Sequence, residues 1–250
     1  MPQRIHSLPG SVNPFPTRPR FIRLPLLAGC GLVLLAGTST CFGADWSGNA
    51  TVTSDYVWRG TTQSSGDPAL QAGLKVAADS GFYASVWGSN VSFGPEVGAD
   101  TEFDFTAGWS GSLGQDWALD ANVLHYRYPG SEVDLDWTEL NGTITYRDNY
   151  WLAVGYSPEA LGSDDSGVYT LVGARFPINE RFRLEAAVGH YALNAVYDES
   201  YWHGQLSAIW SPRQAVELRV TAHATDANAK SIFGDSYAGS RVEAAATVSF

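Results

Sequence analysis

The chain has 250 residues, of which 15 are Lys or Arg and 26 are Asp or Glu, so its net charge is −11 at pH 7. This acidic balance argues against a nucleic-acid partner, because phosphate contacts need a basic surface. Hydrophobic residues make up 44% of the chain, which supplies enough apolar surface for a folded protein and argues against disorder.

The first 44 residues have the layout of a secretory signal peptide. They contain no acidic residue, and four arginines precede an apolar run over 24–37 that is followed by small residues. A basic start, a short apolar middle and a small-residue exit are typical of exported proteins. We therefore expect a signal peptide over 1–44, cleaved near Gly43 or Ala44, and a mature domain over 45–250.

Both cysteines of the chain, Cys30 and Cys41, lie in this leader. Residues 27–30 also resemble a lipoprotein cleavage box, but the apolar sequence that continues after Cys30 favours ordinary cleavage. The mature chain is then free of cysteine, and no disulfide is expected in it.

The mature chain alternates between apolar and polar residues with a period of two, which is the pattern of β-strands. Its first segment places one set of residues on a mostly apolar face: Trp46, Gly48, Ala50, Val52, Ser54, Tyr56 and Trp58. Twelve segments of this kind are predicted, over 46–60, 68–78, 82–91, 101–111, 117–127, 137–147, 150–157, 168–176, 182–191, 201–210, 216–226 and 240–250.

The connections between these segments are alternately short and long. Outer-membrane barrels have short turns at the periplasmic end and longer loops at the outer end. The sequence therefore predicts an all-β fold, a single transmembrane antiparallel up-and-down barrel of about 12 strands.

Aromatic residues gather near the ends of the apolar faces, as expected for two belts at the water–lipid interfaces. The belt expected at the short turns contains Trp46, Trp109, Trp117, Trp151, Phe182, Trp210 and Phe250. The belt expected at the long loops contains Tyr56, Trp58, Phe103, Tyr156, Tyr169 and Trp202.

Several sequence stretches carry a family resemblance. The most specific are Asp55-Tyr56-Val57-Trp58-Arg59-Gly60 and Tyr128-Pro129-Gly130, and further similar stretches lie at 68–71, 80–91, 102–104 and 137–140, so that the similarity extends over about 45–250. The chain resembles the TorF-type porin family, also called Gcw_chp, although Val57-Trp58 departs slightly from the commoner pair. The resemblance implies a bacterial outer-membrane barrel and a pore, with no particular solute.

If the apolar faces point to lipid, the charged residues of the opposite faces line the lumen. The pore-lining candidates are Asp55, Arg59, Lys75, Glu102, Asp104, Glu139, Arg147, Arg175, Arg183, Glu185, Glu217, Arg219, Arg241 and Glu243. Two interpretations stay open for them: a network of paired charges that fills a narrow lumen, or a basic constriction that selects solutes.

The long loops carry a second charge pattern, in which twelve acidic residues are opposed only by Lys230. They form either a solvated surface that holds divalent cations with lipopolysaccharide, or an electrostatic funnel for cations. The acids are Asp67, Glu96, Asp100, Glu132, Asp134, Asp136, Glu159, Asp164, Asp165, Asp198, Glu199 and Asp235.

No nucleophile, metal or phosphate-loop motif accompanies the four histidines of the mature chain, so we expect neither enzyme activity nor a cofactor. The predicted function is passive passage of small polar solutes or ions across the outer membrane. The alternative is a non-conducting structural or surface-adhesion barrel that acts through its acidic loops. Expected partners are outer-membrane lipid, lipopolysaccharide and, through the terminal strand ending in Phe250, the barrel-assembly machinery.

Overall fold

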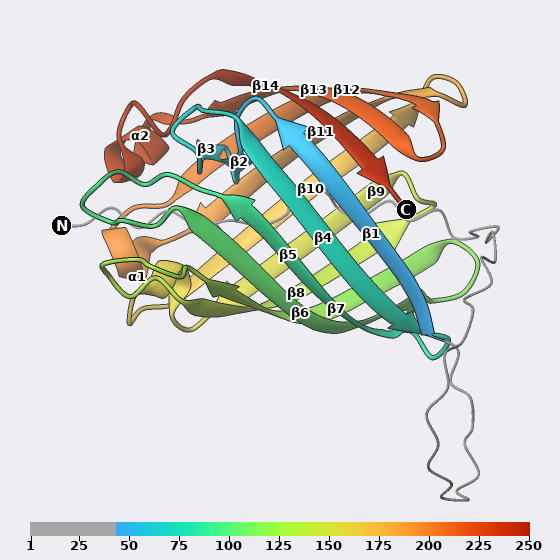
Figure 1. Ribbon diagram of the computed structural model, residues 1–250, viewed down its shortest axis with the longest axis horizontal. Helices are drawn as coiled ribbons and strands as arrows, with labels where there is room; N and C mark the ends of the chain where they lie inside the picture. Colours follow the sequence, from blue (N-terminus) through green and yellow to red (C-terminus); the bar gives the residue numbers. More distant parts are fainter. Residues whose placement is uncertain (1–43) are drawn as a thin grey trace, which may run out of the picture.

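The computed structural model describes residues 44–250, and the signal peptide expected over 1–44 lies outside the described residues except for Ala44. Twelve long strands form one closed antiparallel sheet (Figure 1). They are β1 (Ala44–Thr53), β4 (Ala69–Ala78), β5 (Phe82–Asn90), β6 (Thr101–Ser112), β7 (Trp117–Arg127), β8 (Trp137–Tyr146), β9 (Tyr150–Ser157), β10 (Gly167–Pro177), β11 (Phe182–Ala192), β12 (Tyr201–Arg213), β13 (Val216–Thr225) and β14 (Arg241–Ser249). The predicted barrel of twelve strands is confirmed.

The first strand and the last strand pair with each other and close the barrel. Strand β1 pairs with β4 on one side and with β14 on the other. The terminal residue completes this seam, because Phe250 and Gly48 exchange two backbone hydrogen bonds of 2.8 and 2.9 Å. No strand edge of the barrel is therefore left unpaired along this seam.

The two faces of the barrel differ as the period-two pattern predicts. Large apolar side chains cover the outer surface, and Trp46, Phe82 and Leu70 are each 65% exposed there. The inner surface carries the charged residues together with a cluster of buried aromatic rings. Outward and inward positions alternate along the strands, and the large exposed apolar side chains lie on the outward ones, which is the arrangement of a barrel with an apolar exterior.

The two ends of the barrel also differ. Short turns join the strands at one end, and longer connections gather at the other, on the left in Figure 1. The longer connections contain β2 (Val57–Trp58), β3 (Thr61–Thr62), the 3-10 turn η1 (Ala160–Gly162), α1 (Asn194–Tyr197) and α2 (Ala227–Phe233). We call these the turn end and the loop end. Among residues 44–250, the helices are all too short or too polar to cross a membrane.

The first strand is shorter than the predicted span of 46–60. Strand β1 ends at Thr53. The backbone N–H of Ser54 donates to the carbonyl oxygen of Ala244 at 2.8 Å, and the hydroxyl oxygen of Ser54 accepts from the backbone N–H of Ala244 at 2.9 Å. These two hydrogen bonds end the pairing of β1 with β14. The chain then turns into the barrel interior as a small hairpin made of β2 and β3. The alternation continues through this hairpin because its arms are also extended, so periodicity alone did not reveal the break.

Four aromatic residues of the expected belts lie inside the barrel. Tyr56, Trp58, Trp151 and Tyr169 are all buried and belong to inward positions or to the hairpin. Their assignment to the outer belts was wrong, because an aromatic ring near a strand end can fill the interior as well as mark an interface. The other predicted belt residues lie on the outward positions of their strands.

Candidate functional site

The interior of the barrel contains a tight hairpin, which we call the inner hairpin and define as residues 55–64. Its arms pair Val57 with Thr62 and Trp58 with Thr61, so Arg59 and Gly60 form a two-residue turn. Both turn residues have positive φ, 45° and 84°, as a type I′ turn requires. A Cβ on Gly60 would also lie 2.7 Å from His203, so glycine is needed here for space as well as conformation.

Arg59 anchors the tip of the inner hairpin to the far wall. Its Nη2 donates to both carboxylate oxygens of Glu139 on β8, at 2.8 Å each. Its guanidinium carbon lies 3.9 Å from the ring centroid of Tyr169 on β10 and 4.4 Å from that of Tyr191 on β11. A planar guanidinium suits this site better than an ammonium, because it can stack on rings while it donates to a carboxylate.

Two further contacts hold the hairpin. The Asp55 carboxylate accepts from Arg241 on β14 at 2.7 Å and from the hydroxyl of Thr62. The Tyr201 hydroxyl on β12 donates to the backbone oxygen of Arg59 at 3.0 Å. Asp55, Arg59 and Gly60, which belong to the stretch that carries the family resemblance, are thus the residues that shape and fasten this hairpin.

The strand order shows where the inner hairpin runs. It departs between β1 and β4, whereas β8, β10 and β11 lie on the opposite side of the ring. The contacts of Arg59 with those strands therefore mean that the hairpin spans the lumen near the loop end and narrows it. Asp55 and Arg59 face the lumen from this hairpin and not from the barrel wall, where the sequence placed them.

The turn half of the lumen contains an arginine cluster, Arg175, Arg183 and Arg219. Glu185 accepts from all three, at 2.8, 3.0 and 3.4 Å, and Glu217 accepts from Arg183 at 2.6 Å and Arg219 at 3.1 Å. The positive charge is therefore largely neutralised within the wall. This geometry supports paired charges over a purely basic constriction.

The other charged candidates of the wall form smaller groups. Lys75 on β4 lies over the ring of Tyr83 at 3.7 Å, and the Tyr83 hydroxyl donates to Asp120 at 2.9 Å. Glu243 on β14 contacts His223 at 3.0 Å and accepts from Thr53 at 2.9 Å.

Glu102 and Asp104 on β6, which we call the acidic pair, differ from the rest. They occupy successive inward positions and are 0% and 1% exposed. Within residues 44–250, neither has a Lys or Arg partner, and the Tyr56 hydroxyl donates to Glu102 at 3.4 Å.

Charge is distributed unevenly along the barrel axis. The loop half of the lumen holds five acids, namely Asp55, Glu102, Asp104, Glu139 and Glu243, against Arg59 and Arg241. The turn half holds Asp120, Glu185 and Glu217 against Lys75, Arg175, Arg183 and Arg219. By this count the acidic residues outnumber the basic ones near the loop end, and the basic residues outnumber the acidic ones by one near the turn end.

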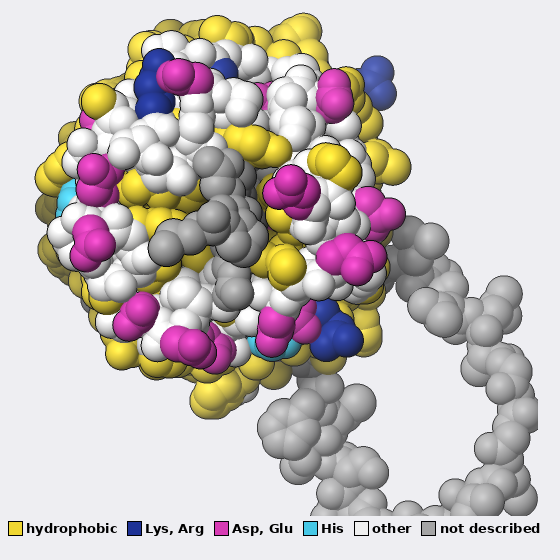
Figure 2. All heavy atoms as spheres, turned by 90° about the vertical axis from the view of Figure 1, so that its left-hand side faces the viewer, with side chains coloured by type: hydrophobic (Ala, Val, Ile, Leu, Met, Phe, Trp, Pro, Cys, Tyr) yellow, Lys and Arg dark blue, Asp and Glu magenta, His cyan; other side chains and the backbone are white. Residues whose placement is uncertain are grey.

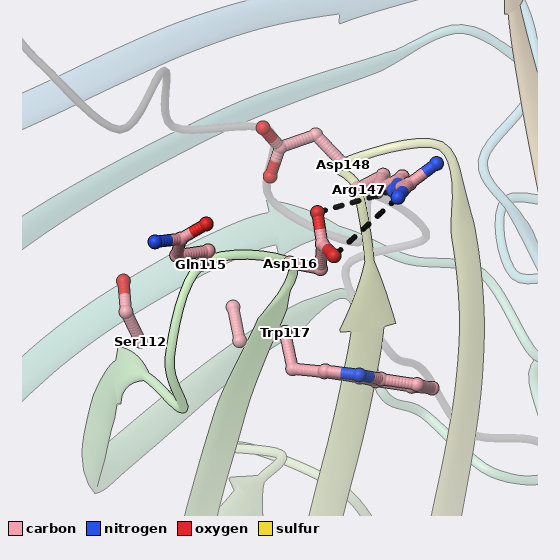
Figure 3. Close-up of a pocket in the computed structure, with 7 residues that line it drawn as sticks. Ser112, Gln115, Asp116, Trp117, Arg147 and Asp148 are labelled. Atoms are coloured by element: carbon pink, nitrogen blue, oxygen red, sulfur yellow. Dashed lines mark hydrogen bonds and ion pairs between the residues drawn. The ribbon is translucent and has the colours of Figure 1, made fainter.

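Arg147 lies outside the lumen. It follows β8 in a turn, with φ of 50° and a side chain that is 61% exposed, and its Nε donates to Asp116 at 3.1 Å. That hydrogen bond raises the pKa of Arg147. Figure 3 shows this pair in a shallow pocket of the turn end, beside Trp117. The predicted strand ran one residue too far, which put Arg147 on the inner face in error.

The loop end presents the acidic surface that the sequence predicts. Figure 2 shows acidic side chains around the rim with few basic ones between them. Lys230 pairs with Asp235 at 3.1 Å, and Arg127 at the end of β7 pairs with Asp136 at 3.0 Å. The remaining rim acids keep the mouth negative.

The sequence did not indicate that aromatic side chains surround Arg59. Tyr169, Tyr191 and Tyr201 come from three different strands, and the Tyr169 hydroxyl contacts His203 at 2.8 Å. Each of these rings sits near a strand end in the sequence, which is also where belt residues occur. Only their common contact with the inner hairpin distinguishes these three rings from the belt residues.

Comparison with solved structures supports the same fold at low sequence identity. The chain is similar to a KdgM porin, with 7% identity, a TM-score of 0.53 and coverage of 82% of this chain and 99% of that one. It is similar to a NanC porin, with 12% identity, a TM-score of 0.52 and the same coverage. No curated protein sequence matches this chain.

A family model described as a bacterial protein of unknown function, Gcw_chp, matches residues 37–250. This range covers every strand of the barrel and the whole inner hairpin. The chain belongs to the Gcw_chp family.

Proposed function

We propose that this protein is an outer-membrane channel that lets small polar solutes or ions pass through a narrow, charged lumen. The observation that carries the proposal is the reversal of polarity across the wall: Trp46 and Leu70 project outward, whereas Glu185 and Arg219 project inward. Charged groups facing lipid cost about 2–4 kcal/mol at the midplane, whereas charged groups in a lumen can face water or each other.

The fold likeness to porins supports the proposal, as does the resemblance of the Asp55–Gly60 motif to the TorF-type porins. In this proposal the protein is exported by a signal peptide over 1–44. The barrel-assembly machinery recognises the terminal strand that ends in Phe250. The rim acids lie among lipopolysaccharide and raise the local cation concentration at low salt.

The inner hairpin sets the width of the channel in this proposal. Eight-stranded barrels are filled by side chains and sixteen-stranded barrels leave a clear channel, so twelve strands give an intermediate bore. A hairpin that spans such a bore leaves room for small solutes only. Its buried Arg59–Glu139 ion pair, at 2.8 Å, makes this constriction a fixed part of the wall.

A second function rests on the same hairpin. If the inner hairpin fills the lumen completely, the protein is a structural or adhesive barrel that acts through its acidic loops. The conductance of the intact barrel distinguishes the two functions.

The test is planar-bilayer recording on protein purified from membranes of an expressing bacterium. We expect discrete current steps smaller than those of sixteen-stranded porins. Migration of unboiled and boiled samples on a denaturing gel serves as the control for a closed barrel. A barrel that shows the gel shift but carries no current in the bilayer would exclude the channel and favour the adhesive barrel.

A further inference from the structure

We propose that the outer wall of the barrel over β5–β8 binds one zwitterionic phospholipid. Its headgroup occupies the turn-end pocket beside Arg147, which we call the headgroup pocket, and an acyl chain occupies an apolar groove on the same wall. Phosphatidylethanolamine, which carries a phosphate ester and an amine, has the required chemistry. The inference rests on the proposed membrane location of the barrel, but it does not depend on conduction.

Two neighbouring turns hold the headgroup pocket in shape. The pocket has a volume of about 290 Å³ and lies between the turn that precedes β7 and the turn that follows β8 (Figure 3). The backbone N–H of Arg147 donates to the backbone oxygen of Asp116 at 2.7 Å. The Nη1 of Arg175 donates to the backbone oxygen of Asp148 at 2.9 Å. These bonds fix the backbone that carries the charged side chains, so the pocket exists before a ligand arrives.

The charges of the headgroup pocket complement a zwitterion. Arg147 donates to Asp116 through Nε at 3.1 Å and Nη2 at 3.5 Å, and its side chain is 61% exposed. A guanidinium has five N–H donors, so this one keeps donors for a phosphate oxygen. Asp148 is exposed at the same pocket and offers acceptors to an amine. One basic and two acidic side chains favour a ligand that adds a positive group to its phosphate over a ligand that is only anionic.

The headgroup pocket opens at the level of a lipid interface. Trp117 lines it, occupies an outward position of β7 and is 45% exposed. The Trp117 ring packs against that of Tyr146 on β8, with 4.7 Å between the ring centroids. Tryptophan and tyrosine are typical of the depth at which lipid headgroups lie. A ligand of this pocket therefore meets the lipid face of the barrel and not its lumen.

The apolar groove lies on the same outer wall and has a volume of about 560 Å³. Ala121 in the groove follows Trp117 by four residues on β7, which is about 13 Å along a strand. An acyl chain spans half of the hydrocarbon core, about 15 Å, so it reaches the groove from the headgroup pocket. The outward residues of the groove are Phe82, Ala107, Trp109, Ala121, Val123 and Leu140.

Small outward side chains create the groove. Ala121 pairs with Gly142 on β8, and a Cβ added to Gly142 would meet no atom within 4 Å. The larger rings of Phe82 and Trp109 border this space. A charged pocket that continues into an apolar groove matches a phospholipid, whereas a second copy of the barrel would present an apolar wall to both.

The test is native mass spectrometry of the detergent-purified barrel, with dioleoyl phosphatidylethanolamine or dioleoyl phosphatidylglycerol added at equal concentration. We expect one bound phosphatidylethanolamine per barrel, held about tenfold more tightly than phosphatidylglycerol, because the second lipid has no amine for Asp148. D148N should abolish this preference. R147Q should weaken the binding of both lipids about tenfold, because both carry the phosphate.

Matched variants separate the site from general effects of charge and size. E180Q and R181Q change an exposed acid and an exposed arginine in the turn between β10 and β11, and both should bind lipid as the wild type does. A121F fills the groove and should weaken both lipids, whereas A222F adds the same ring to an outward position of β13 and should not. Equal losses in A121F and A222F would overturn the groove.

Three further outcomes would overturn the proposal: equal binding of the two lipids by the wild type, a preference that persists in D148N, or barrel dimers that A121F disrupts in the absence of lipid. The lipid site and the channel can fail separately. A barrel that conducts but shows no lipid preference would reject the site and keep the channel. A barrel that shows the preference but carries no current would reject the channel and keep the site.

Discussion

One nitrogen of Arg59 donates to both carboxylate oxygens of Glu139, at 2.8 Å each, and this pair joins a hairpin that leaves the wall between β1 and β4 to the opposite side of the barrel. Both side chains are 1% exposed. Arg59 and Glu139 are 80 residues apart in sequence, yet their side chains meet across the lumen. In the proposed channel, this pair would link the width of the lumen to the stability of the barrel.

Replacing Arg59 by Met should both destabilise the barrel and widen its lumen. Removing one member of a buried ion pair costs about 3–5 kcal/mol, because the other charge stays buried. The hairpin tip also loses its anchor, so we expect a larger and noisier single-channel current. Urea unfolding in detergent and bilayer recording measure the two effects.

The control for Arg59 is R127M, which breaks the exposed Arg127–Asp136 pair at the loop end. An exposed pair contributes about 0–1 kcal/mol, so this variant should resemble the wild type. The double variant R59M/E139Q should be more stable than R59M, because it leaves no unpaired carboxylate. Equal stability of R59M and R127M would contradict the role assigned to the bridge.

Replacing Glu185 by Gln should destabilise the turn half of the barrel. Arg175, Arg183 and Arg219 lose their common acceptor and repel one another. Hydrogen bonds to charged groups contribute about 1.5–3 kcal/mol, so the loss in the free energy of unfolding should fall in that range. E217Q removes an acceptor of only two arginines and should cost less. A larger loss in the free energy of unfolding for E217Q than for E185Q would contradict this role of Glu185.

E185Q should also move ion selectivity toward anions, because it leaves three arginines against Glu217 alone. The reversal potential in a KCl gradient measures this change. A variant that is less stable but keeps the wild-type reversal potential would show that the arginine cluster lies away from the ion path.

Replacing Gly173 by Ala should disturb the packing inside the turn half. A Cβ at this inward position of β10 would lie 2.1 Å from the Trp151 ring, which covers it. Overpacking of this kind costs about 1–3 kcal/mol. A Cβ at Gly142 would meet no atom within 4 Å, so G142A should be neutral. The unfolding midpoint should be lower for G173A than for G142A, and equal midpoints would contradict this account.

Replacing Phe250 by Ala should lower the yield of folded barrel. The ring lies against Gly48, where an added Cβ would be 2.7 Å from it, and the residue ends the seam between β1 and β14. Phe176 is another exposed aromatic residue on the outer surface, but it lies within β10 and away from the seam. The fraction that migrates as a compact band without boiling should fall in F250A and not in F176A. Equal losses in both variants would point to a general need for outward aromatic rings.

The sequence by itself determined the barrel. Period-two alternation, as in Trp46, Ala50 and Val52 against Thr51 and Thr53, sets which side chains share a face, because successive residues of a strand point to opposite sides. Twelve such segments with alternating short and long connections then leave little choice of topology. The inward placement of Glu102, Glu139, Arg183 and Arg219 follows from the same rule.

Only the tertiary structure decided how the interior is filled. The inner hairpin alternates as a strand does, so nothing local shows that Asp55 and Arg59 leave the wall after Thr53. The partners of these residues, Arg241 and Glu139, are 186 and 80 residues away in sequence. Such contacts depend on closure of the barrel and on the register of its strands, because these two features place side chains from distant strands at the same level along the barrel axis. For the same physical reason, the sequence could not show that the acidic pair is left without a cationic partner among the described residues.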